Sequence, residues 1–389
     1  MPDIKKLLKN MDWLLLGVLM VTLGFNLLVL YSASSNVVSG KPYYIMQRQL
    51  VWVIGGIIIM SAIALYDYHN YEKYSRIAYV FIIILLIGVL FMPEQKGAHR
   101  WYPLPFLDFQ PSELAKVIII AVMAGFFAKR EPEMGQTINI IKSAVIILLP
   151  FLLILIEPDL GTSLVFLVIF AAMAWVGGVP KKLVAIALIT VLVLVIVLFV
   201  VLGALTGGFQ YQPDDEAIPD WIPLKGYQVT RLVIFINPYM DPLDKGYHMI
   251  QSQIAIGSGG FMGKGLGNGS QVQGNFLPEH HTDFIFSVVG EELGFVGTFT
   301  ILGLYLFILI RLLWHAFRAK DLYGSLIIVG VVAMFAFQIF TNAGMTIGVM
   351  PVTGLPFPML TYGGSSMLLC MICWGMVFSV ILRREVVLF

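Results

Sequence analysis

The sequence is poor in charge and in cysteine. Only 12% of its 389 residues are charged, whereas soluble domains carry about 25%. This composition excludes a soluble globular protein and a disordered chain. The 24 basic and 23 acidic residues nearly cancel, so charge gives no argument for a nucleic-acid partner. The two cysteines, Cys370 and Cys373, lie in one apolar run without further ligands nearby, which favours packing over a zinc or redox site.

Apolar residues, by contrast, make up 59% of the chain. A bilayer is the solvent that accepts this much apolar surface. Runs long enough to cross it predict an all-α polytopic membrane protein with ten transmembrane helices, in a single domain over residues 1–389. The predicted spans are 13–31, 49–66, 77–92, 113–128, 143–157, 163–178, 183–204, 284–310, 324–341 and 359–382.

The distribution of lysine and arginine predicts the orientation. These residues are about twice as frequent in the segments that share the side of the termini as in the opposite segments. We therefore expect both termini to be cytoplasmic.

One segment on the opposite side, 205–283, is far longer than the other connections and is expected to be a large extracytoplasmic loop. Its acidic, proline-rich part, 210–223, indicates no chemistry. Further on, Val229, Val233 and Ile236 follow helical spacing, which predicts a short amphipathic helix. The spacing leaves open whether this helix lies on the membrane or packs on the bundle.

The same loop contains seven glycines between Gly257 and Gly269, together with Ser258 and Lys264. The spacing does not fit a Walker A motif. A run of exposed amide groups beside one cation could cradle a phosphate. A flexible turn is the alternative, and spacing alone favours it.

The segment 276–286 stands directly before the eighth predicted span. Thr282 or Asp283 could cap the helix that follows. Alternatively, Asp283 is a carboxylate that accepts a proton from a sugar hydroxyl beside two histidines. A third interpretation is a divalent-cation cluster of Glu279, His280, His281 and Asp283, for which adjacency in sequence is weak support.

Several more ionisable side chains stand at or inside span ends, where they are costly unless paired or facing water. Glu113 and Lys116 are three residues apart and can pair on one helical face. Together these charges predict a polar cavity that opens outward and suits an anionic, lipid-linked substrate such as a pyrophosphate. The other members are Arg48, Arg100 beside Trp101, Glu157, Asp159, Glu291 and Glu292.

The motifs together resemble the SEDS (shape, elongation, division and sporulation) family of peptidoglycan glycosyltransferases, and most of all its elongation members. The resemblance covers most of the chain in the family's order. It rests on 97–101 (GAHRW), 110–116 (QPSELAK), 157–161 (EPDLG), 246–260, 276–286 (FLPEHHTDFIF), 290–297 (GEELGFVG) and 351–366 (PVTGLPFPMLTYGGSS).

The resemblance implies an enzyme that polymerises lipid II by transferring the growing glycan from undecaprenyl pyrophosphate to the 4-hydroxyl of N-acetylglucosamine, with Asp283 as catalytic base. Glu113 would orient Lys116, and the resemblance allows a divalent cation, Mg²⁺ or Mn²⁺. Glu157, Asp159 and Glu292 would shape the cavity. The remaining substrate-binding set is Arg48, Arg100, Trp101, Lys116, Arg231, Ser258, Lys264 and His281.

The resemblance also implies the bacterial cytoplasmic membrane as location, an extracytoplasmic active site, and two kinds of partner: a class B penicillin-binding protein and the elongation machinery. The chain departs from the family at Thr361, at Phe261 and Met262 within the glycine segment, and at the insert 210–223. These departures leave the glycine segment's contacts open.

Two alternatives remain open from the sequence. A lipid II flippase would also need many spans and a charged cavity, and an inactive scaffold would need only to bind its partner. The concentration of candidate residues on one side argues against transport, because alternating access requires a site near the bilayer midplane.

Overall fold

The computed structural model describes residues 9–34, 43–93, 99–103, 108–157, 159–205, 208, 226–243, 246–274 and 276–384. The predicted acidic insert, 210–223, lies outside these residues. Ten helices of at least 17 residues occur in the described part of the chain. They are α2 (Trp13–Ala33), α3 (Tyr44–Leu65), α4 (His69–Val89), α5 (Pro111–Arg130), α6 (Thr137–Ile156), α7 (Leu160–Val176), α8 (Lys181–Leu205), α12 (Ile285–Phe317), α13 (Leu322–Thr346) and α14 (Gly364–Leu382).

Short elements connect these helices. Strands β1 (Tyr102–Pro103) and β2 (Asp108–Phe109) form an antiparallel pair with Tyr102 opposite Phe109. The 3-10 turn η1 (Glu131–Glu133) follows α5. The long loop contains α9 (Gly226–Ile236), η3 (Pro238–Met240), α10 (Tyr247–Gly259) and α11 (Ser270–Gln273).

Each long helix overlaps one predicted span, and the chain is a polytopic membrane protein. Eight of the helices are long and apolar enough to cross a membrane, and α7 is shorter at 17 residues. Helix α4 carries Glu72, Lys73 and Arg76 in its first turns and is not among the eight. The number of ten spans therefore stays a prediction.

Several predicted boundaries differ from the helix ends, and two of them differ for identifiable reasons. Helix α4 begins at His69 rather than near 77, because its first turns carry charges that a search for apolar runs passes over. Helix α14 begins at Gly364 rather than at 359. Pro356, Pro358 and Gly363 stand before it, and such residues favour turns over helix.

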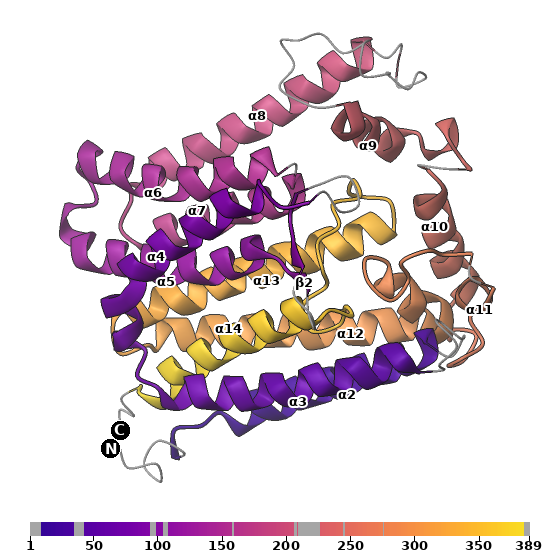
Figure 1. The fold of residues 1–389 in the computed structure, drawn as a ribbon, viewed down its shortest axis with the longest axis horizontal. Helices are drawn as coiled ribbons and strands as arrows, with labels where there is room; N and C mark the ends of the chain where they lie inside the picture. The colour runs from indigo at the N-terminus through magenta and orange to yellow at the C-terminus, as the bar shows by residue number, and fades with distance from the viewer. Residues whose placement is uncertain are drawn as a thin grey trace.

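Helix α13 lies at the centre of the bundle, where it contacts α5, α7, α12 and α14. The helices differ sharply in their burial: 78% of the apolar stretch of α14 is buried but only 6% of that of α8. Helix α8 lies along one edge of the bundle, whereas α9, α10 and α11 gather at the end opposite to the beginning of α2 and the end of α14 (Figure 1).

The predicted amphipathic helix is confirmed as α9. Val229 and Val233 on its apolar face are buried against Leu202 of α8. This face therefore packs on protein, which favours packing on the bundle over lying free on the membrane.

Helix α12 is broken at Gly294, whose φ of 65° is outside the helical range. Such a break frees helical carbonyl and amide groups, which must find other partners. The glycine segment supplies them: the Lys264 and Gly265 amides donate to the carbonyls of Glu291 and Glu292 at 3.0 and 2.9 Å. The Phe295 amide donates in turn to the Gly260 carbonyl at 2.9 Å. A Cβ on Gly294 would lie 2.3 Å from the Gly263 nitrogen, so this approach requires glycine.

A buried aspartate joins the helix ends on the side of the termini. Asp12 accepts hydrogen bonds from the Leu15 amide at 3.0 Å and from Arg311 Nε and His315 Nε2 at 2.7 Å each. Burial raises its pKa, but the bonds from Arg311, Leu15 and His315 outweigh burial and lower the pKa to about 2. Asp12 is therefore ionised at neutral pH and ties the beginning of α2 to the last turns of α12.

We expect Asp12→Ala to lower the unfolding free energy by about 3 kcal/mol, because the change leaves the partly buried Arg311 guanidinium, the buried His315 ring and the Leu15 amide without their shared acceptor. Thermal unfolding of the purified protein in detergent at pH 7 measures this loss. Asp67→Ala is the matched control, since the Asp67 side chain is 47% exposed and pairs with Arg383 at 3.5 Å. Its loss should stay below about 1 kcal/mol, and equal losses in the two variants would contradict the assignment.

Candidate functional site

Asp283 lies two residues before the beginning of α12, and its side chain is half-buried. The N-cap of α12 is Phe284, and no side chain caps it; the Thr282 hydroxyl donates instead to Glu279 Oε2 at 2.9 Å. The interpretation of Thr282 or Asp283 as the helix cap is therefore wrong. On the other side, Asp283 Oδ2 lies 3.6 Å from the position that a Cβ on Gly354 would occupy, so the carboxylate faces the 351–363 segment.

One buried amide fixes Asp283 relative to this segment. Asn342 Nδ2, in α13, donates to the Asp283 carbonyl at 3.0 Å and to the Leu355 carbonyl at 2.8 Å. Asn342 is fully buried. The backbone beside Asp283 and the segment that the carboxylate faces are therefore held by the same side chain.

Two other predicted regions meet this segment. Arg231 Nη1, on α9, donates to the Val352 carbonyl at 3.4 Å. At the beginning of α7, a Cβ on Gly161 would lie 2.7 Å from the Thr353 carbonyl. The structure thus brings Arg231, the first turn of α7 and Asp283 to one short stretch of chain.

His281 and Arg48 lie toward the other end of the segment. The Tyr362 amide donates to the His281 carbonyl at 3.0 Å, and the two rings are 5.9 Å apart. Burial raises the pKa of the Tyr362 hydroxyl, and the positive charge of Arg48 opposes that shift. Arg48, at the beginning of α3, also lies over the Tyr44 ring at 5.6 Å.

Arg100, Glu157 and Asp159 form a second group. Arg100 Nε donates to the Glu157 carbonyl at 2.9 Å, and its Nη1 lies 3.9 Å from Asp159 Oδ2. Asp159 caps α7 through the Thr162 amide at 3.1 Å and accepts from Gln110 Nε2 at 3.2 Å. Trp101 follows Arg100 and directly precedes β1.

The Glu157 carboxyl is fully buried, and neither of its oxygens has a hydrogen-bond partner among the described residues. Burial, reinforced by Asp159 and opposed by Arg100, raises its pKa to about 9. Glu157 therefore carries a proton at neutral pH.

Glu113 and Lys116 pair as their spacing predicts. Lys116 Nζ donates to Glu113 Oε1 at 2.5 Å, and both side chains are buried. They line a cavity of about 10 Å³ together with Gln338 and Cys370, which suffices for about one water molecule. This cavity cannot hold a sugar, so Glu113 and Lys116 reach a substrate only through further movement.

The glycine segment has a structural role that its spacing did not predict. Lys264 Nζ donates to Glu291 Oε1 and to Ser270 Oγ, both at 2.7 Å. Glu292 is buried and accepts from Ser32 Oγ at 2.7 Å. Because the amides of Lys264 and Gly265 serve α12, the phosphate nest is wrong for these two groups. A phosphate contact by Lys264 itself stays a prediction, as does one by Ser258, whose hydroxyl donates to the Ala255 carbonyl at 2.9 Å.

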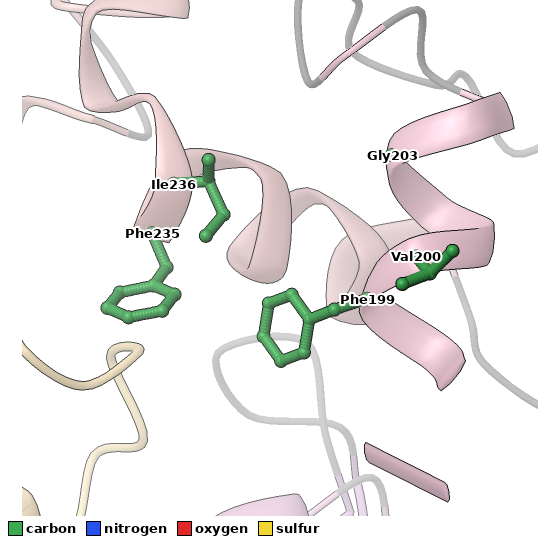
Figure 2. Close-up of a pocket in the computed structure, with 5 residues that line it drawn as sticks. All are labelled: Phe199, Val200, Gly203, Phe235 and Ile236. Carbon is green, nitrogen blue, oxygen red and sulfur yellow. The ribbon is translucent and has the colours of Figure 1, made fainter. Parts of the chain in front are cut away.

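A larger hollow than the cavity beside Lys116 lies at the end of α8. A cavity of about 490 Å³ separates the end of α8 from α9, and its lining is apolar: Phe199, Val200, Gly203, Phe235 and Ile236 (Figure 2). It contains no ionisable group and therefore does not match the predicted polar cavity.

The predicted metal cluster does not form. Among the described residues, no group of three or more histidine, cysteine, aspartate or glutamate side chains is placed to hold a metal ion. The His280 ring nitrogens instead face the carbonyls of Leu277 and Ala33, at 2.8 and 3.0 Å. Glu279, His280, His281 and Asp283 therefore do not provide a protein metal centre.

Sequence reasoning missed the residues that hold the site together. These include three polar residues inside apolar helices: Asn26, Gln49 and Asn342. Polar residues are costly in such helices unless they have a role, and this cost could have identified them from the sequence. His248 of α10 was missed as well; its ring stacks on Phe284 with centroids 6.0 Å apart.

We expect the stability of the protein to fall as pH rises from 5 to 9. In this range Glu157 keeps its proton in the folded state, whereas in the unfolded chain its pKa is near 4.5 and it releases the proton. Rising pH therefore favours the unfolded chain. Glu157→Gln removes this titration and should raise the melting temperature at pH 8 while leaving it nearly unchanged at pH 5. Melting temperatures across this range measure the effect. Glu133→Gln, at an exposed position, should change nothing, and a pH dependence that survives in Glu157→Gln would contradict the assignment.

Comparisons with known proteins agree over nearly the whole chain. A family model described as cell cycle protein, covering FtsW, RodA and SpoVE, matches residues 12–385. The chain is 35% identical to the peptidoglycan glycosyltransferase RodA of Treponema pallidum over 432 aligned residues, which cover 96% of this chain and 98% of that protein. It is also 35% identical to the peptidoglycan glycosyltransferase MrdB of Escherichia coli K12 over 377 residues, with 97% and 95% covered.

Solved structures resemble it over a similar extent. A chain from a peptidoglycan synthase complex, described as coordinating polymerization and crosslinking, has a TM-score of 0.77 and 30% identity, with 95% of this chain and 97% of that chain covered. RodA of Thermus thermophilus has a TM-score of 0.68 and 26% identity, with 96% and 97% covered. The resemblance to the SEDS family is confirmed. The chain belongs to the FtsW, RodA and SpoVE family of cell cycle proteins.

Proposed function

We propose that this protein is a peptidoglycan glycosyltransferase that polymerises lipid II. It transfers the growing glycan from undecaprenyl pyrophosphate to the 4-hydroxyl of the N-acetylglucosamine of an incoming lipid II. The names of the relatives, peptidoglycan glycosyltransferases of the RodA and FtsW types, support this activity.

In the proposed step, Asp283 accepts the proton of the 4-hydroxyl while the hydroxyl oxygen attacks the anomeric carbon of the donor. The bond from this carbon to the pyrophosphate oxygen breaks, and undecaprenyl pyrophosphate leaves with the electron pair. The configuration inverts, from an α-linked donor to a β-1,4 product. A carboxylate suits this role because a general base must be ionised before reaction and within reach of the proton.

The negative charge that develops on the leaving group requires cations nearby. Arg231 contacts the segment that Asp283 faces, and Arg48 lies near Tyr362 at its other end. We propose these two arginines as the pyrophosphate ligands next to the base, with Arg100 binding further along the substrate. Lys116 would join Arg100 only after the movement that its buried position requires. A divalent cation, Mg²⁺ or Mn²⁺, would add positive charge beside the pyrophosphate, and we keep it as part of the proposal without routing a step through it.

The observation that carries the proposal is the position of Asp283. The carboxylate is half-buried and faces Gly354, with Oδ2 3.6 Å from where a Cβ on that glycine would lie. The Asp283 carbonyl accepts a hydrogen bond from Asn342 Nδ2 at 3.0 Å, which fixes the backbone. A base held in this way costs little reorganisation when the reaction occurs.

A flippase fits less well. The relatives are named for glycosyl transfer, and Asp283 lies just before the beginning of α12, at a helix end rather than in the middle of a span. An alternating-access site is expected near the midplane instead.

We also propose the bacterial cytoplasmic membrane as location, with both termini in the cytoplasm and Asp283 on the outside. A class B penicillin-binding protein is the proposed partner, acting with the elongation machinery. One support is the similar chain from a synthase complex that coordinates polymerization and crosslinking.

Asp283→Asn should reduce the rate of polymer formation from purified lipid II by at least about 100-fold, because an amide cannot accept the proton. Gel separation of labelled glycan chains, with and without the class B penicillin-binding protein, measures the rate. The melting temperature should change little, since the side chain is half-buried.

Asp108→Asn is the control for this substitution, because Asp108 is exposed on β2. It should polymerise like the unaltered protein. Full polymerisation by Asp283→Asn, or passage of the lipid II head group across sealed vesicles without new glycosidic bonds, would refute the proposal.

Asn342→Ala should slow polymerisation roughly 10- to 100-fold, since misplacement of a catalytic group by even a small distance lowers the rate steeply. Its control is Asn139→Ala: Asn139 is also buried and donates from Nδ2 to the Glu133 carbonyl at 3.0 Å, on the side of the termini. Both variants lose buried hydrogen bonds and should be destabilised by about 1–3 kcal/mol. If both lose activity to the same degree, Asn342 contributes stability alone.

A further inference from the structure

Three arginines surround one tryptophan where α12 ends. The guanidinium carbons of Arg318, Arg311 and Arg384 lie 3.9, 4.4 and 5.8 Å from the centroid of the Trp314 ring. Arg311 comes from α12, Arg318 follows its last residue, and Arg384 follows α14. Because the three guanidinium groups share one ring as neighbour, their like charges repel one another, and a negative charge nearby would stabilise the arrangement.

The described residues supply only part of that charge. Asp12 is the one described carboxylate that pairs with these arginines, through Arg311 Nε at 2.7 Å. Its oxygens also accept from the Leu15 amide and from His315 Nε2. Among the described residues, Arg384 contacts only uncharged groups within hydrogen-bond distance, the His315 ring at 3.1 Å and the Asn10 carbonyl at 3.3 Å. Two positive charges therefore exceed what the described part of the chain neutralises.

The pKa of Arg384 lies below its ordinary value. Burial lowers the pKa of Arg384; the Asp12 carboxylate opposes that shift, and the charges of Arg311 and Arg318 add to it. A bound anion between these guanidinium groups would relieve their repulsion.

The surroundings indicate what kind of anion fits. Ile310, Leu313 and Phe317 recur at the spacing of one helical face beside Trp314, and they are 58%, 37% and 89% exposed. Tryptophan and arginine together are typical of the headgroup level of a membrane, with apolar side chains facing the acyl region. A ligand that lies along this surface would therefore carry an anionic head and an apolar tail.

We propose that Trp314, Arg311, Arg318 and Arg384 bind the phosphate of an anionic phospholipid, with its acyl chains along Ile310, Leu313 and Phe317. The site lies on the side where α2 begins and α14 ends, away from Asp283. It is independent of the glycosyl transfer proposed above.

Native mass spectrometry of the full-length protein in detergent tests this site, with phosphatidylglycerol and phosphatidylcholine as probes. The unaltered protein should retain phosphatidylglycerol in preference to phosphatidylcholine. Arg318→Gln combined with Arg384→Gln should weaken phosphatidylglycerol binding by roughly 10-fold or more, since each basic residue near a membrane surface contributes a sizeable part of anionic lipid affinity. Phosphatidylcholine binding should not change.

The matched control is Lys181→Gln combined with Arg130→Gln. In both cases one cation lies over one aromatic ring: Lys181 lies 5.7 Å from the Trp175 ring centroid, and Arg130 lies 4.4 Å from that of Phe126. The control removes the same charge and should keep the preference for phosphatidylglycerol. If the double variant at the site unfolds, Arg318→Gln alone serves as the test, because the only side-chain contact described for Arg318 is with the Trp314 ring.

Several outcomes would overturn the proposal. Equal weakening in both double variants would indicate general charge attraction rather than a site. Displacement of the lipid by millimolar inorganic phosphate would indicate a site for free phosphate. An unaltered protein that retains an acidic peptide but not phosphatidylglycerol would indicate a protein partner.

Discussion

The 351–363 segment is irregular chain inside a bundle of membrane helices, and such chain is tolerated only where other protein groups satisfy its backbone. Buried side chains of the surrounding helices provide these partners. Asn342 donates to the Leu355 carbonyl, Asn26 to the Leu360 carbonyl, and Gln49 Oε1 accepts from the Gly363 amide. The position of Asp283 depends on this arrangement, because the same Asn342 amide also holds its backbone.

These polar residues explain how much of the site could be predicted. Long apolar runs locate the helices, because a bilayer demands them whatever the tertiary contacts. The pair of Glu113 with Lys116 also follows from the sequence, since three residues separate them on one helix. Asn342, by contrast, acts on chain that is 59 residues before it and 13 residues after it. Nothing local in the sequence announces such a contact, and only the packed bundle reveals it.

The glycine segment illustrates the opposite error. Seven glycines beside a lysine were compatible with phosphate binding, because exposed amides do bind anions. The structure uses the amides of Lys264 and Gly265 for helix α12, and Gly263 and Gly294 are glycines because the two backbones approach within 2.3 Å of where a Cβ would be. The same glycine pattern is compatible with phosphate binding and with support of a broken helix. The contacts of its amides with the Glu291 and Glu292 carbonyls decide for the second role.

The break in α12 connects this structural role to the reacting group. Asp283 stands two residues before α12, and Gly294 ends the first part of that helix. This short first part is therefore held at both ends: near Asp283 by Asn342, and near the break by the glycine segment, with Lys264 paired to Glu291. A continuous helix would tie the carboxylate to the long lipid-facing remainder of α12. The break instead fixes it to the α10 side of the bundle, where the described part of the long loop contributes Arg231 and His248.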